Sequence, residues 1–106
     1  MGHFVIAAYR PKPGGEQNLL QCVRDHLPIL RSQKLVTDRP PYVMRARDGT
    51  IVEVFEWKSE EATKQAHSNP EVLKLWKRFD ECSTYVMLNA LPEVGEMFPH
   101  FEPIDV

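Results

Sequence analysis

The chain has 106 residues, of which 42% are hydrophobic and 26% charged, a mixture that fits one globular domain with its own core. No stretch is apolar for long enough to span a membrane, and the first residues do not begin a signal peptide, so we expect a cytoplasmic protein. A net charge of −2 without a basic stripe disfavours nucleic acid as a partner.

The first third of the sequence predicts a strand followed by a helix. Residues 3–10 form a short apolar run that stops at the Pro/Gly cluster of residues 11–15, which is typical of a strand entering a turn. Apolar residues then recur at helical spacing and predict a helix over 16–33. Cys22 in this helix and Cys82 lie far apart in the sequence, so we expect neither a metal pair nor a disulfide, but two small buried residues in a reducing compartment.

A β-hairpin follows, because Asp48-Gly49 separates two strand-like runs, residues 42–47 and 50–57. A two-residue type I′ turn at Asp48-Gly49 pairs Met44 with Glu53. One face of the hairpin then carries Tyr42, Met44, Ala46, Ile51, Glu53, Phe55 and Trp57, and the other face carries Val43, Arg45, Arg47, Val52, Val54 and Glu56.

The second half of the chain resembles the first in its order of elements. Ser59 is suited to cap a helix over 60–67, Asn69-Pro70 starts a helix over 70–82, and residues 84–91 predict a fourth strand. The order strand, helix, strand, strand, helix, strand predicts an α+β, ferredoxin-like βαββαβ fold with a four-stranded antiparallel sheet and both helices on one face.

The other face of such a sheet has no cover. Because Phe55 and Trp57 are the bulkiest residues, we expect their face beneath the helices, with Val43, Val52 and Val54 on the open face. Exposed apolar patches of this kind mark interfaces, so we predict a homodimer joined through those valines.

Residues 1–91 are expected to form the ferredoxin-like domain, and residues 92–106 a C-terminal extension. The extension contains the apolar residues Val94, Met97, Phe98, Phe101 and Ile104. We expect it to pack on the body or on the partner subunit, with a short helical turn at 93–98. A disordered tail is the alternative.

The order of elements, the stretch Val54-Phe-Glu-Trp-Lys-Ser-Glu-Glu-Ala62 and the segment Ala66-His67-Ser-Asn-Pro70 resemble the dimeric α/β-barrel superfamily. Within it, the chain is most similar to the antibiotic biosynthesis monooxygenase-like domains, of which the turn Tyr9-Arg-Pro-Lys-Pro-Gly14 is also typical. The resemblance covers residues 3–91. It implies a homodimer whose sheets meet and a small-molecule cavity between sheet and helices in each subunit. Members of the superfamily include cofactor-independent oxygenases of phenolic polyketides or quinols, haem-degrading enzymes and isomerases.

Glu53 is the first candidate for chemistry, because it lies mid-strand among apolar residues, where a carboxylate needs a partner or an open cavity. It would act as a general base, and His67, which ends the first segment of the second helix, would assist it. The alternative for Glu53 is a carboxylate bonded to buried neighbours, and for His67 a helix cap or a solvent-exposed side chain. A substrate pocket would be lined by Tyr9, Tyr42, Phe55, Trp57, Trp76 and Phe79, although the same aromatic residues could simply form the core.

No metal or cofactor is expected, since the histidines lack metal-ligand spacing and no glycine-rich phosphate loop occurs. The haem-degrading members share an Asn, a Trp and an iron-ligating His, where this chain has Tyr9, Ala66 and Trp76. The resemblance therefore gives no support to haem degradation.

Two functions remain open. The first is a cofactor-independent monooxygenase or isomerase that acts on a small phenolic, quinol or enolisable molecule. The second is a non-catalytic dimeric module that binds a small ligand or is purely structural.

Overall fold

A five-stranded antiparallel sheet with the order β4-β1-β3-β2-β5 forms the centre of the computed structural model, which describes residues 2–106. The strands are β1 (His3–Pro11), β2 (Tyr42–Arg45), β3 (Ile51–Trp57), β4 (Ser83–Val86) and β5 (Glu102–Pro103). The first four strands follow the order of two interleaved βαβ units. The α+β class is therefore confirmed, and the difference from the predicted four-stranded sheet is the additional strand β5.

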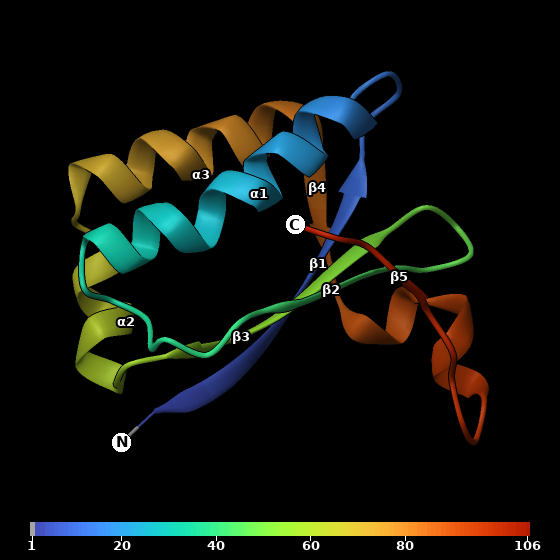
Figure 1. The fold of residues 1–106 in the computed structure, drawn as a ribbon. Helices are drawn as coiled ribbons and strands as arrows, with labels where there is room; N and C mark the ends of the chain where they lie inside the picture. The colour runs from blue at the N-terminus through green and yellow to red at the C-terminus, as the bar shows by residue number, and fades with distance from the viewer. Residues whose placement is uncertain (1) are drawn as a thin grey trace.

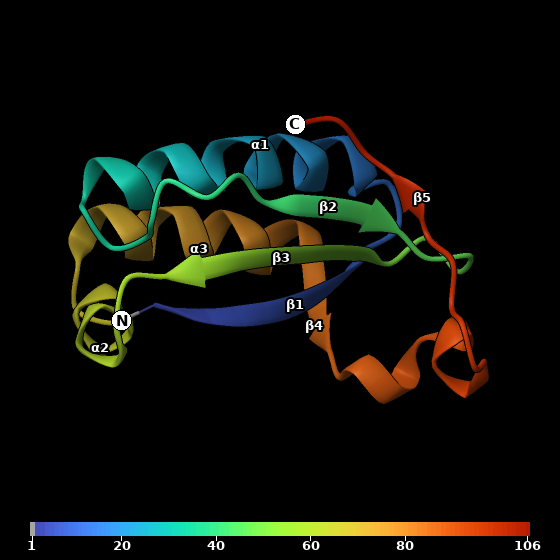
Figure 2. The ribbon, with the colours of Figure 1, turned by 60° about the horizontal axis from the view of Figure 1, so that its bottom comes forward.

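The chain forms three helices, α1 (Glu16–Ser32), α2 (Glu60–Ala66) and α3 (Pro70–Cys82). Helices α1 and α3 lie side by side over one face of the sheet, and α2 lies at the end of the sheet where β3 ends (Figures 1 and 2). The predicted caps form as expected. The Ser59 hydroxyl accepts a hydrogen bond from the Ala62 amide at 3.0 Å, and the Asn69 side chain accepts from the Glu71 amide at 2.9 Å and the Val72 amide at 3.2 Å. No helix in residues 2–106 is both long and apolar enough to cross a membrane.

The register of the β2–β3 hairpin differs by one residue from the prediction. Val43 pairs with Glu53 and Arg45 with Ile51, and the Ala46 amide donates to the Thr50 carbonyl at 2.8 Å, so residues 47–49 form the loop. The reason is that a type I′ turn needs positive φ at both central residues, whereas only Gly49, at φ 91°, adopts it here. Asp48 stabilises the turn differently, by accepting the Thr50 amide at 2.9 Å.

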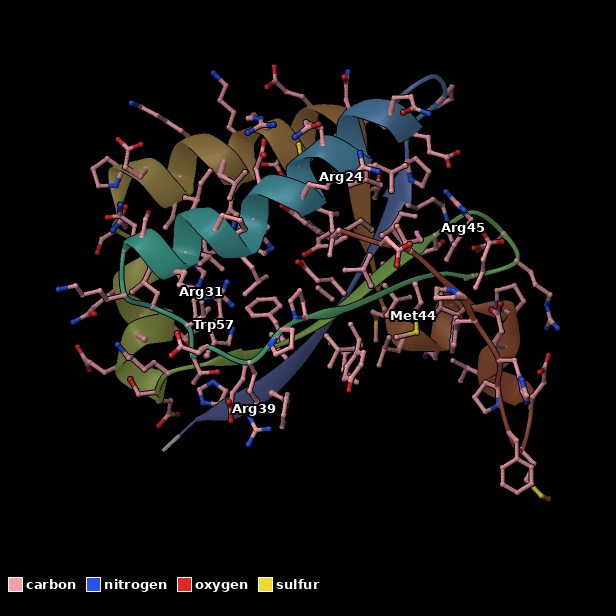
Figure 3. All side chains as sticks on the ribbon, in the orientation of Figure 1. Arg24, Arg31, Arg39, Met44, Arg45 and Trp57 are labelled. Atoms are coloured by element: carbon pink, nitrogen blue, oxygen red, sulfur yellow. The ribbon has the colours of Figure 1, made fainter. Side chains whose placement is uncertain are left out.

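Because of this one-residue shift in register, each β2 side chain lies on the face opposite to the predicted one, whereas the β3 side chains lie on the predicted faces. Val43 lies in the core beneath the helices, whereas Tyr42 is on the open face with 73% of its surface exposed. Met44 and Arg45 accordingly point to opposite sides of β2, and Arg45 bonds to Glu16 of α1 at 2.8 Å and to Glu102 at 2.7 Å (Figure 3). The prediction that Val43 lies on the open face, at the dimer interface, is therefore wrong.

The C-terminal segment packs on the same subunit. It forms two short 3₁₀ helices, η1 (Leu88–Ala90) and η2 (Pro92–Gly95), and then returns to pair β5 with β2. Leu91 and Phe101 pack with Val52 on the open face, so Val52 is only 3% exposed. Of the three valines expected at a dimer interface, Val54 also keeps the predicted face, but it is half-buried in a cavity that the C-terminal segment helps to line.

Glu93 fastens the segment to the hairpin. Its carboxylate is fully buried, and Oε2 accepts the Arg47 amide at 2.7 Å. Because a hydrogen bond to a charged acceptor contributes about 1.5–3 kcal/mol, Glu93→Ala should lower the free energy of unfolding by about that amount. Glu93→Gln retains an acceptor oxygen and should keep more of the stability. Urea unfolding of both variants checks this, and an alanine variant as stable as the wild type would contradict the anchoring role.

Candidate functional site

A buried carboxylate in the middle of the sheet is the centre of the candidate site. Glu53 has no exposed surface, because β1 and β2 flank it and the helices cover it. Its Oε1 accepts the Tyr9 hydroxyl at 2.8 Å and lies 2.8 Å from His26 Nδ1. Its other oxygen, Oε2, has no hydrogen-bond partner within residues 2–106. Glu53 is therefore linked to one side chain from the neighbouring strand and one from α1.

The hydrogen bonds determine which ring nitrogen of His26 carries the proton. The indole N–H of Trp76, which can only donate, lies 3.4 Å from His26 Nε2. Nε2 therefore accepts, and in the neutral imidazole the proton is on Nδ1, from which it is donated to Glu53. A carboxylate that orients an imidazole in this way is the arrangement that prepares a histidine to act as a general base.

Tyr9 holds the carboxylate from the other side. Burial raises the pKa of the Tyr9 hydroxyl well above its usual range, and the charge of Glu53 and the hydrogen bond to it raise the pKa further. Tyr9 therefore remains protonated and donates to Glu53 over the physiological pH range. Its ring packs against Phe79 at a centroid distance of 4.8 Å, which fixes the position of the hydroxyl.

A cavity of about 290 Å³ lies beside this group, between the sheet and the helices. Six aromatic residues line it: Tyr9, Phe55, Trp57, Trp76, Phe79 and Tyr85. The two imidazoles of His26 and His67, with Val5 and Ala7, complete the wall, which contains no lysine or arginine. A small, largely apolar and uncharged molecule fits such a lining.

Most of the residues predicted for the site are brought together. Tyr9, Phe55, Trp57, Trp76 and Phe79 all line the cavity, and Trp57 lies between the sheet and the helices (Figure 3). Tyr42 does not, because the hairpin register turns it to the open face.

The two predicted catalytic residues do not form the pair that was expected. Glu53 lies behind Tyr9 and His26 instead of in the cavity wall, and its imidazole partner is His26. His67 does line the cavity, at the end of α2, where its ring lies 5.1 Å from that of Trp76.

His26 and Tyr85 are the functional candidates that the sequence analysis missed. His26 could have been found from helical periodicity, since it lies one turn after Cys22 and one turn before Leu30, both of which are buried on α1. Tyr85 pairs with Tyr9 across β1 and β4, so the alternation of β4 places it on the cavity side.

Metal ligands do not gather in the part of the chain that the structure describes: residues 2–106 contain no cluster of three or more His, Cys, Asp or Glu side chains suited to an ion.

Comparison with known proteins identifies the fold but not the activity. The structure is similar to that of Rv0793 from Mycobacterium tuberculosis, with a TM-score of 0.62 and 18% sequence identity over 82% of this chain and 94% of that one. It is also similar to a conserved protein from Methanosarcina mazei Go1, with a TM-score of 0.61 and 15% identity over 81% of this chain and 89% of that one. No protein-family model and no curated protein matches the sequence.

The contact between Tyr9 and Glu53 predicts a specific dependence of stability on pH. Because the pKa of Tyr9 is higher in the folded than in the unfolded chain, stability should fall as the pH rises through about 10, where the unfolded tyrosine ionises. Tyr9→Phe should lose about 1–3 kcal/mol at neutral pH and show a shallower alkaline decline. Urea unfolding at neutral and alkaline pH measures both effects. Tyr42→Phe, at an exposed position, is the control, and an unchanged alkaline decline in Tyr9→Phe would disprove the assignment.

Proposed function

We propose that the protein is a small-molecule enzyme in which His26, oriented by Glu53, removes a proton from a phenolic, quinol or enolisable substrate bound in the aromatic cavity. The observation that carries the proposal is the hydrogen bond of 2.8 Å between His26 Nδ1 and Glu53 Oε1 at the wall of an apolar cavity. The resemblance of the sequence to antibiotic biosynthesis monooxygenase-like domains supports the same class of reaction.

The chemistry begins at His26 Nε2, the ring nitrogen that Glu53 does not occupy. An acidic O–H or C–H of the substrate transfers its proton to Nε2, and the buried carboxylate of Glu53 stabilises the resulting imidazolium. Tyr9, through its bond to the same Oε1, positions Glu53. For oxygenation, dioxygen is the second substrate and the substrate, as the carbanion that this proton transfer creates, supplies all four electrons: one oxygen atom forms the new C–O bond and the other leaves as water. Isomerisation needs only the return of the proton to another atom.

Trp76 contributes a hydrogen-bond donor to the same step. Its N–H lies 3.4 Å from Nε2, which is longer than the usual 2.9–3.0 Å and therefore weak. A substrate that delivers its proton to Nε2 replaces this contact, and the indole N–H is then free to donate to the oxygen on which negative charge develops.

Replacement of the proposed base should abolish most of the turnover. In a screen of quinols and phenols followed by product analysis and oxygen uptake, His26→Gln should lower kcat about 10²–10⁴-fold. Glu53→Gln should also lower kcat, because an amide no longer stabilises the imidazolium. His100→Gln, at an exposed position in the C-terminal segment, is the control and should retain full activity. Full activity in His26→Gln would remove His26 from its proposed role.

A non-catalytic module that binds a small ligand is the second candidate. One observation favours it: Oε1 of Glu53 is already bonded to two neighbours, as in a structural network. This candidate predicts that the same quinols and phenols raise the melting temperature of the protein but are recovered unchanged.

The open face of the sheet supports an assembly of two copies. It carries Phe4, Ile6, Tyr42, Met44 and Val54, and Phe4 and Ile6 are 59% and 49% exposed. An exposed apolar sheet face is stable in water when it packs on a second one, and a twofold axis lets one patch serve both subunits. The proposed homodimer thus uses these residues in place of the valine set expected from the sequence.

A charge in the middle of this face should separate the subunits. Ile6→Lys is expected to shift sedimentation from dimer to monomer, because the lysine would be buried without a partner. Leu73→Lys is the matched control, since Leu73 is 45% exposed but lies on α3, away from the face. A wild-type protein that sediments as a monomer at micromolar concentration would contradict the proposal.

A further inference from the structure

The two cysteines are neighbours in the fold, although they lie far apart in the sequence. Cys22 is on the buried side of α1 and Cys82 is the last residue of α3, and both are free thiols in the same apolar cluster. The Cys82 thiol donates weakly to the Phe79 carbonyl at an S···O distance of 3.7 Å. Burial, and to a lesser extent the adjacent Cys82 thiol, raise the pKa of Cys22 to about 11.

The backbone holds the two helices together at this end. The Lys12 amide donates to the Cys82 carbonyl at 2.9 Å, so the turn that leads into α1 is bonded to the end of α3. A side chain at Gly15 would come within 2.6 Å of the same carbonyl oxygen, so only glycine allows so close an approach. These main-chain contacts hold the end of α3, and with it Cys82, against the start of α1.

A second cavity borders both cysteines. It has a volume of about 300 Å³, and Cys22 and Cys82 line it together with Asn18, Gln21, Arg78 and Glu81. None of these residues lines the cavity beside His26. Arg78, which is paired with Asp25 at 2.9 Å, places a positive charge near the thiols and opposes the rise in the pKa of Cys22. Burial outweighs this charge, so Cys22 is mostly protonated at neutral pH, and the thiolate that reacts with oxidants forms more readily as the pH is raised.

We infer that Cys22 and Cys82 form a site of reversible oxidation, at which a peroxide joins α1 to α3 through an intramolecular disulfide. One thiolate attacks a peroxide oxygen and breaks the O–O bond, which gives a sulfenic acid and, after protonation, water. The second sulfur then attacks the sulfenic sulfur, the S–S bond forms, and the hydroxyl leaves as a second water. Overall, the two thiols lose two protons and two electrons, and hydrogen peroxide is reduced to two waters. A dithiol reductant reverses the change.

The experiment treats the native, full-length protein with hydrogen peroxide, blocks the remaining thiols with an alkylating reagent and digests the protein with trypsin without reduction. Because trypsin cuts after Arg24 and Arg78 and no lysine or arginine follows Arg78, we expect peptide 79–106 linked to the peptide that ends at Arg24. Dithiothreitol should separate them, and a non-reducing gel should show the linked chain at the position of a single subunit.

Cys22→Ser and Cys82→Ser are the matched controls and should give no linked peptide. Alkylation of both cysteines after peroxide treatment of the wild type would overturn the inference. So would sulfinic acid on either residue without a link, or a disulfide only between chains. None of these outcomes depends on whether His26 is a catalytic base, since the measurement requires no substrate.

Discussion

The fold depends on the buried carboxylate of Glu53, which needs hydrogen-bond partners. Glu53 is fully buried in the middle of β3, and an unpaired charge there would cost several kcal/mol. Its partners come from two other elements, Tyr9 from β1 and His26 from α1, and both bond to the same oxygen at 2.8 Å. The pairing of β1 with β3 and the placement of α1 over the sheet are therefore coupled to one polar group. The same contacts leave His26 Nε2 and the Trp76 N–H together beside an apolar cavity. Fold and candidate chemistry thus share one interaction.

The sequence was sufficient for the features that periodicity determines. Alternation along β3 identified Glu53, Phe55 and Trp57 as facing the helices, and the capping residues Ser59 and Asn69 marked the starts of α2 and α3. The sequence did not predict which histidine bonds to Glu53. His67 stood out because it ends a helix near a proline, yet the end of α2 lies toward Trp76. His26 is brought to Glu53 by the packing of α1 on the sheet, which local sequence does not encode but which its position on the buried side of α1 would have suggested.

The hairpin shows how a small local ambiguity reverses a functional assignment. Asp48-Gly49 is compatible with a two-residue loop and with a three-residue loop that ends in a left-handed glycine. The two differ by one residue in register, and one residue moves every β2 side chain to the opposite face. Burial decides between them: the observed register places Val43 in the core beside Ile51, and leaves the hydroxyl of Tyr42 in solvent. β3 was not affected, because its central position provided enough apolar residues to fix its faces independently of the turn.

The contact between α1 and α3 links the two chemical features of the molecule. Cys22 lies one helical turn before His26, and Cys82 lies three residues after Phe79, whose ring is 5.1 Å from that of His26. A covalent bond between the cysteines would fix the separation of the two helices within one turn of the residues that line the aromatic cavity. Because close-packed protein cores adapt poorly to small displacements of a helix, a shift at the sulfurs would be transmitted to the imidazole. The hydrogen bond from His26 to Glu53 is short and directional, so its length and angle would change with a small shift of the imidazole.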